Sequence, residues 1–237
     1  MPAHFRNSLL TALLALVFGF LGAAIWSYAG LADNRTRAFL LDNPDMLPKM
    51  AEAYQAQQAR ERLAELGDEV YEPFPGAVLG NPEGSKVLVE FSDYNCGYCE
   101  ASLADVERLV EEDPDLKVVL RELPQFEGSE AAARMALAAA LQGKYAAFHD
   151  AMFARGPAGP ESAEAVARDI GLDMDRARTD MASDAVSVEL ARNFSMARAL
   201  GFNGTPAWVT RGTTINGAVG YDRLSEAVRD AGTNAEG

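Results

Sequence analysis

The chain has 237 residues, of which 49% are hydrophobic, so it is long enough for one sizeable core with an appendage. Its formal net charge of −14 argues against nucleic acid as a partner. With only 2 cysteines, the chain is not a scaffold held together by several disulfides.

Residues 1–29 have the composition of an export signal or a membrane anchor. Met1 to Arg6 is a short basic segment, Leu9 to Trp26 is apolar, and Ser27-Tyr28-Ala29 offers small residues for cleavage. The apolar stretch is long for a signal peptide and short for a membrane span, so both alternatives stay open. In either case we expect the rest of the chain to be exported, in the periplasm or another oxidising compartment.

Residues 30–76 are expected to form an N-terminal helical arm and a linker. Asp42-Asn43-Pro44-Asp45 is typical of a helix start, because proline fits the first turn and acidic side chains favour the helix dipole there. The predicted helix runs to Leu66 and stops at Gly67, and Glu72 to Gly76 marks the linker. Its apolar residues fall on two stripes that are out of phase, which argues against a coiled coil. A solvated spacer and an arm that joins subunits into a homo-oligomer remain as alternatives.

The most informative stretch is Cys96-Gly97-Tyr98-Cys99, between a predicted strand and a predicted helix. Lys86 to Phe91 is almost continuously apolar, which is typical of a strand covered on both faces at the centre of a sheet. After the motif, apolar residues recur at helical spacing from Ala101 to about Glu111. Cys96 is therefore expected at a helix start with Asn95 as the N-cap, where unpaired N–H groups and the helix dipole favour a thiolate.

Redox chemistry fits this cysteine pair better than the other uses of such a spacing. A zinc site would have to be completed by carboxylates, since a second cysteine pair is missing and the only histidines are His4 and His149. Covalent haem attachment requires a histidine where Glu100 stands, and a disulfide across so short a ring adds little stability. We expect Cys96 to be the nucleophile and Cys99 the resolving thiol of a redox-active disulfide, with no metal and no cofactor.

Glu90 interrupts the apolar strand before the motif. If it is buried, its pKa is raised and it becomes a usable proton acceptor for the resolving thiol. The alternative is a solvated acid on an exposed strand edge.

The rest of the chain predicts a second core strand, a helical insertion and a closing hairpin with a helix. The second strand is expected at Leu116 to Leu123. Helix formers dominate from Ser129 to about Leu200, with breaks at 156–160 and at Gly171. The closing elements are expected at Ala207 to Thr210, Thr213 to Asn216 and Tyr221 to Ala231.

Four segments in this order resemble the DsbA-like branch of the thioredoxin superfamily. They are Leu79 to Pro82, Phe91 to Cys99, Gly143-Lys144-Tyr145 with Phe148-His149-Asp150, and Gly204 to Ala207. The resemblance covers roughly Ala77 to Ala231. It implies an α/β thioredoxin-like fold in a domain of residues 77–237, with an inserted helical subdomain over about 129–200 and the N-terminal helical arm in front.

The resemblance also implies roles for residues outside the cysteine pair. Thr205-Pro206 would be a cis peptide that faces the cysteines, with the backbone beside Thr205 pairing with the substrate, and Glu90 falls at the family's buried acid. Gly97, Tyr98 and Thr205 differ from the residues of strongly oxidising members and are similar to those of ScsC-type and isomerase-type relatives. We expect Gly97 and Tyr98 to contact the substrate as well.

These features predict an exported thiol:disulfide oxidoreductase that acts on cysteine-containing client proteins and is recycled by a membrane redox partner. Two alternatives stay open. An oligomeric disulfide isomerase or reductase would use the same residues with another direction of electron flow. A Cu(I)-binding carrier is the alternative of another class, because two adjacent thiolates are soft ligands, although no third cysteine or methionine-rich cluster stands beside the motif.

Overall fold

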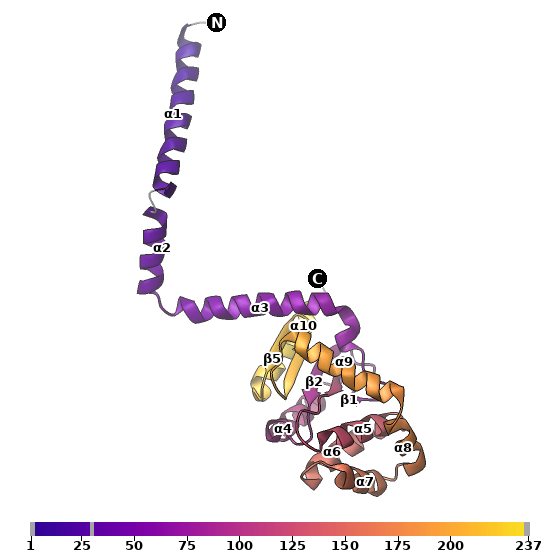
Figure 1. Ribbon diagram of the computed structural model, residues 1–237. Coiled ribbons are helices and arrows are strands. Elements are labelled where there is room, and N and C mark those ends of the chain that lie inside the picture. Colours follow the sequence, from indigo (N-terminus) through magenta and orange to yellow (C-terminus); the bar gives the residue numbers. More distant parts are fainter. Residues whose placement is uncertain (1–2, 29–30, 235–237) are drawn as a thin grey trace. The chain divides into compact units, whose positions relative to one another are not determined.

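The computed structural model of the chain describes residues 3–28 and 31–234 (Figure 1). The chain divides into two compact units, Met1–Gln55 and Ala56–Gly237. The division crosses helix α3 (Met46–Leu66), whose second half packs with the C-terminal unit.

The first unit consists of helices. In α1 (Ala3–Tyr28), the window Thr11–Tyr28 is long and apolar enough to cross a membrane, with a mean hydropathy of 1.8. Helix α2 (Leu31–Asp42) was not predicted, and the predicted helix start at Asp42 is wrong, because α3 begins at Met46. The reason is local: the side-chain amide of Asn43 donates to the Phe39 carbonyl oxygen at 2.8 Å and closes α2, which leaves Pro44 in the turn between the helices.

The second unit is built around a five-stranded sheet in the order β1-β3-β2-β4-β5. The strands are β1 (Val78–Gly80), β2 (Lys86–Ser92), β3 (Leu116–Glu122), β4 (Ala207–Thr210) and β5 (Thr213–Asn216). Strand β2 is central, as predicted, and its residues from Val87 to Ser92 are all buried. It runs parallel to β3 and antiparallel to β4, whereas the short strand β1 was not predicted.

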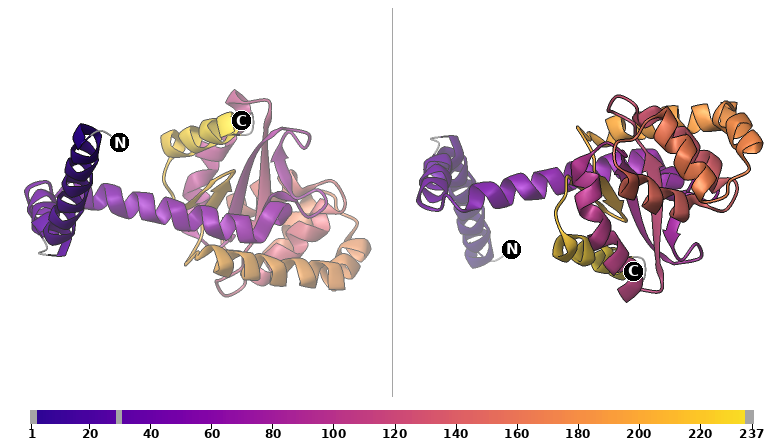
Figure 2. Two further views of the ribbon diagram at one scale, coloured as in Figure 1. Left: turned by 90° about the horizontal axis from the view of Figure 1, so that it is seen from above. Right: turned by 90° about the horizontal axis from the view of Figure 1, so that it is seen from below.

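Helices cover both faces of this sheet, as the two opposite views of Figure 2 show. Helices α4 (Gly97–Glu112) and α10 (Tyr221–Asn234) pack on one face. The other face is covered by the end of α3, the short 3-10 helix η1 (Gly67–Tyr71) and α9. The predicted insertion consists of α5 (Ser129–Ala140), α6 (Tyr145–Arg155), α7 (Pro160–Asp169), α8 (Met174–Met181) and α9 (Asp184–Leu200). It is interrupted at both predicted breaks.

A buried arginine ties η1 and the following segment to the sheet. Arg121 is fully buried in β3, and its Nη1 donates to Glu189 of α9 at 2.7 Å. Its Nη2 donates to the backbone carbonyl oxygens of Glu69, Val70 and Glu72. The first residue of the predicted linker, Glu72, is therefore hydrogen-bonded to the core. This is one reason why the unit boundary lies in α3, N-terminal to the expected boundary at residue 76.

Candidate active site

Cys96 is the N-cap residue of α4, with an extended backbone conformation of φ −90° and ψ 109°. Its Sγ donates to the carbonyl oxygen of Thr205 at 3.1 Å, and the residue is 5% exposed. The prediction that Asn95 is the N-cap is wrong, since α4 begins one residue later than that placement requires. The sulfur lies at the positive end of the helix dipole, among backbone N–H groups of the first turn.

Asn95 instead connects the motif to the helical insertion. Its Oδ1 accepts from the backbone N–H of Ala158 at 2.7 Å. Its Nδ2 lies 3.0 Å from three acceptors, the carbonyl oxygens of Glu127 and Ala158 and the hydroxyl of Ser129. The residue before Cys96 is thus fixed by hydrogen bonds to two segments of the chain, residues 127–129 and Ala158.

The Asp93 side chain fixes the same loop through several hydrogen bonds. This buried carboxylate accepts from the backbone N–H groups of Asn95 and Gln125 at 2.8 and 2.5 Å, and from that of Phe126 at 3.1 Å. It also accepts from the Ser129 hydroxyl. These four hydrogen bonds hold the loop in one conformation.

Cys99 lies one turn further along α4 and is fully buried. Both cysteines are free thiols, so the structure is that of the reduced protein. Burial, together with the nearby Glu90 carboxyl, raises the pKa of the Cys99 thiol well above its usual value. The two thiols therefore differ in access: Cys96 keeps a small exposed fraction, whereas the fully buried Cys99 needs help to lose its proton.

Glu90 is buried in the middle of β2, which excludes the exposed-edge alternative. Burial raises the pKa of its carboxyl to about 8. In the sheet it pairs with Leu120 of β3 and Trp208 of β4. A carboxyl with a pKa near neutrality is suited to accept and return a proton.

The Thr205-Pro206 peptide bond is cis, as the resemblance implied, and it precedes β4. The Thr205 carbonyl is the group that meets Cys96. Gly97 opens onto free space, because a Cβ atom there would meet no atom within 4 Å. Tyr98 is 71% exposed, so both residues between the cysteines are accessible.

A pocket of about 220 Å³ opens beside Cys96. It is lined by Tyr94, Asn95, Cys96, Gly97, Glu100, Phe153, Gly156 and Pro157. The insertion therefore supplies one wall of the site through Phe153 and the loop after it. In the part of the chain that the structure describes, no group of three His, Cys, Asp or Glu side chains is placed to hold a metal ion.

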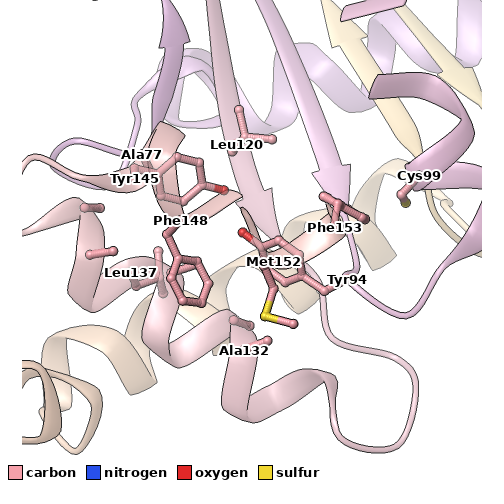
Figure 3. Packing of buried hydrophobic residues seen from close by; sticks show 14 of the residues in the cluster. Ala77, Tyr94, Cys99, Leu120, Ala132, Leu137, Tyr145, Phe148, Met152 and Phe153 are labelled. Carbon is pink, nitrogen blue, oxygen red and sulfur yellow. The ribbon is translucent and has the colours of Figure 1, made fainter. Parts of the chain in front are cut away.

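A second buried carboxyl lies close to the first and was missed by the sequence reasoning. Glu122 ends β3, and its Oε1 accepts from the hydroxyls of Tyr145 at 2.6 Å and Tyr94 at 3.2 Å. The two phenol rings extend toward each other beside the strands (Figure 3). The Tyr94 hydroxyl also lies 3.3 Å from Nδ1 of His149. An acid within a predicted apolar strand, the signal that drew attention to Glu90, was available for Glu122 too, since it lies in the strand predicted at Leu116 to Leu123.

Burial sets the charge states in this group. It raises the pKa of Glu122 to about 8 and lowers that of His149 to about 4. His149 is therefore neutral around pH 7, packed between Tyr145 and Phe153 in α6.

These features agree with the comparison of the chain with known proteins. Residues 87–229, more than half of the chain, match the family described as the DSBA-like thioredoxin domain. The chain belongs to this DsbA-like family. The predicted thioredoxin-like fold with its helical insertion is confirmed, and residues 87–229 form an oxidoreductase domain of this family.

Two solved structures of DsbA-like relatives illustrate the similarity. A thioredoxin-like oxidoreductase from Silicibacter pomeroyi DSS-3 is 42% identical, with 70% of this chain and 97% of that chain covered and a TM-score of 0.66. The catalytic domain of Proteus mirabilis ScsC is 29% identical, with 73% of this chain and 97% of that chain covered and a TM-score of 0.64. The predicted resemblance to ScsC-type proteins is thereby confirmed.

Curated relatives match over part of their length. The Na(+)/H(+) antiporter NhaA of Herminiimonas arsenicoxydans is 31% identical over 182 residues, which is 74% of this chain and 29% of that protein. Across the first three such relatives, the chain spans between 24% and 29% of their length.

Proposed function

We propose that the chain is an exported thiol:disulfide oxidoreductase that exchanges disulfides with client proteins through Cys96 and Cys99. The observation that carries this proposal is the position of the Cys96 sulfur at the start of α4, against the Thr205 carbonyl, with Cys99 buried one turn deeper. A client can therefore reach the Cys96 sulfur, whereas the Cys99 sulfur can react only inside the protein.

In the proposed reaction the Cys96 thiolate attacks one sulfur of a client disulfide. An S–S bond forms between Cys96 and the client, and the other client sulfur leaves as a thiolate. The thiolate of Cys99 then attacks Cys96, the protein disulfide forms, and the second client thiolate departs. The client gains two electrons and the protein loses two. The reverse sequence oxidises a client dithiol.

We assign the proton transfer at Cys99 to Glu90. Cys99 has no access to solvent, and Glu90 is the carboxyl whose charge affects the Cys99 thiol. Its ionised form accepts the Cys99 proton before the attack on Cys96, and its acid form returns a proton in the opposite direction.

Client binding is assigned to the backbone around Thr205-Pro206 and to the two residues between the cysteines. The Thr205 carbonyl lies beside the reactive sulfur, so an extended client segment at Cys96 is within reach of this backbone. Gly97 leaves room for the segment, and the exposed Tyr98 ring offers an apolar contact.

Export and membrane partners follow from the N-terminal segment. Residues Thr11–Tyr28 would serve either as a cleaved signal or as an anchor. Both alternatives place the thiols in an oxidising compartment, where a membrane redox protein would restore the cysteine pair after each cycle.

An oligomeric isomerase is the second candidate. It is favoured by exposed apolar side chains in the first half of α3, among them Leu47, which is 74% exposed, and Met50. Covering these side chains with further copies of the arm would bring several Cys96 sites to one client.

The reduction potential of the Cys96–Cys99 pair tests the direction of the reaction. The measurement is equilibration with glutathione buffers, read out by quantifying the two thiols. Strong oxidants and strong reductants of this type lie about 150 mV apart, so the value separates them. Activity is tested in parallel by trapping client proteins on Cys99→Ser. A variant that forms no mixed disulfide, although Cys96 is reactive, would contradict the proposed exchange.

A further inference from the structure

Glu90 and Glu122 lie on the same face of two neighbouring parallel strands. The register pairs Glu90 with Leu120 and Ser92 with Glu122. Because side chains alternate along a strand, the two carboxyls, which lie two register pairs apart, point to the same side of the sheet. Leu120, on this side of the sheet, belongs to the same buried cluster as Cys99.

The hydrogen bonds around the two carboxyls differ. Two phenol hydroxyls, of Tyr94 and Tyr145, donate to a single oxygen of Glu122. A carboxyl that receives hydrogen bonds is stabilised in its ionised form. The side-chain group that favours the ionised form of the neighbouring Glu90 is the single hydroxyl of Ser92, in a strand that is buried from end to end except at Lys86.

His149 completes the arrangement. If Tyr94 donates to ionised Glu122, the Tyr94 oxygen is free to accept from Nδ1–H of His149. Nε2 of His149 is then without its proton, and it is buried with no hydrogen-bond partner. One charge state of Glu122 is thereby linked to one tautomer of His149.

We propose that Glu122 is a positioning residue that sets the pH range in which Glu90 accepts the Cys99 proton. This inference rests on the proposed role of Glu90. Two buried carboxylates disfavour each other's charge, so one proton stays on the pair over a wide pH range. The phenol donors place the negative charge on Glu122, and this charge keeps the proton on Glu90.

The charged and titratable groups around Glu122 come from three elements. They are Glu90 on β2, Asp93 and Tyr94 in the loop after it, and Tyr145 and His149 on α6. The two other carboxyls both oppose ionisation of Glu122, and His149 is neutral. Among these groups, the two phenol donors therefore favour the ionised form of Glu122.

The proposal concerns the resolving step. The Cys99 proton passes to the Glu90 carboxylate, the Cys99–Cys96 bond forms, the Cys96–client bond breaks, and the client leaves as a thiolate. A Glu90 that is already protonated cannot take this proton. Removing the charge of Glu122 allows Glu90 to ionise at lower pH, so resolution should become efficient at lower pH.

The test measures how the rate of mixed-disulfide resolution in Glu122→Gln depends on pH. The rate is read from the release of a labelled client peptide in a single turnover. We expect the midpoint to fall by about half a pH unit or more, which makes the rate on the acidic limb about threefold faster. Tyr145→Phe, which removes one donor from Glu122, should move the midpoint in the same direction. In a Glu90→Gln background the Glu122→Gln change should produce no shift.

Three outcomes overturn the inference. One is an unchanged midpoint in Glu122→Gln while Glu90→Gln alters the pH profile. Another is that Glu122→Gln shifts the midpoint equally in the unmodified protein and in the Glu90→Gln background. The third comes from carboxyl NMR titration of the unmodified protein, which does not depend on a variant folding. We expect two linked steps in which Glu122 loses its proton at lower pH than Glu90, whereas loss of the Glu90 proton first overturns the proposal. An unchanged profile in Glu90→Gln alone would instead refute the role of Glu90.

Discussion

The thiol of Cys96 donates a 3.1 Å hydrogen bond to the backbone carbonyl of Thr205, two segments that lie 109 residues apart in the sequence. Because the acceptor is a backbone atom, its position depends on the conformation around Pro206 and on the pairing of β4 with β2. The sheet thus places the reactive sulfur and the proposed client-binding backbone side by side.

The first prediction concerns the two thiols. In the reduced protein at pH 7, iodoacetamide should modify Cys96 at least about tenfold faster than Cys99, because Cys99 is buried and its thiol resists ionisation. Mass spectrometry after short exposure measures this ratio. Unfolding in urea should make the two rates similar, and equal rates in the folded protein would contradict the assignment of Cys96 as the nucleophile.

The second prediction concerns the pH dependence of stability. Burial raises the pKa of Glu90 to about 8, whereas the unfolded chain releases this proton near pH 4.3. The associated stabilisation is complete below the unfolded pKa and is lost as the pH rises through the folded pKa. Between pH 6.5 and 8, where any contribution of His149 is common to both proteins, we expect the free energy of unfolding to fall more steeply in the unmodified protein than in Glu90→Gln.

Urea denaturation at several pH values gives these slopes. Glu122 contributes in the same direction, so Glu90→Gln should reduce the slope without abolishing it. The same slope in both proteins would mean that Glu90 releases its proton at an ordinary pH in the folded state.

The sequence identified those parts of the site that have a local signal. Cys96 and Cys99 stand out by their spacing, and Glu90 stands out because it interrupts an apolar strand. Glu122 has a similar signal, but its contact with Tyr94 and the contact of Tyr94 with His149 have none, because these residues come together only when the insertion packs beside the sheet.

The errors in the fold have local causes. Proline at position 44 is compatible with a helix start and with a turn between helices, and the sequence alone does not separate the two. Asn95 is a good N-cap residue by type, but its side chain finds several partners in the insertion. Strand β1 has three residues, too few for a period of two to be recognised.

The third prediction concerns Arg121. Arg121→Met should lower the free energy of unfolding by about 3–5 kcal/mol, because it leaves the buried Glu189 with only its longer contact to Arg192 at 3.7 Å and removes a donor from three carbonyl oxygens. Arg155→Met is the matched control. It removes a surface pair with Asp169 and should cost no more than about 1 kcal/mol. Urea denaturation measures both, and similar losses would show that the buried contacts of Arg121 have no special weight.

The last prediction concerns the arm, and the structure fixes where it can be cut. Ala59 and Leu63 of α3 are buried in the second unit, and Arg62 donates to the Leu200 carbonyl oxygen at 3.0 Å. A protein that begins at Ala56 keeps these contacts. One that begins at Gly67 loses them, and we expect it to be less stable by at least about 2 kcal/mol, the lower range for loss of one buried leucine side chain.

If the arm joins subunits, the protein that begins at Gly30 should be oligomeric by light scattering and the protein that begins at Ala56 should be monomeric. The monomer should keep dithiol exchange, because every residue of the proposed site follows Ala56, and it should lose the ability to refold a client with scrambled disulfides. Replacing both Leu47 and Met50 by aspartate in the longer protein is the matched variant. It retains the arm and places charges where an apolar contact between copies would form, so it should behave as the truncated protein does. A protein that is monomeric from Gly30 onward contradicts the oligomeric isomerase and leaves a single-site oxidoreductase.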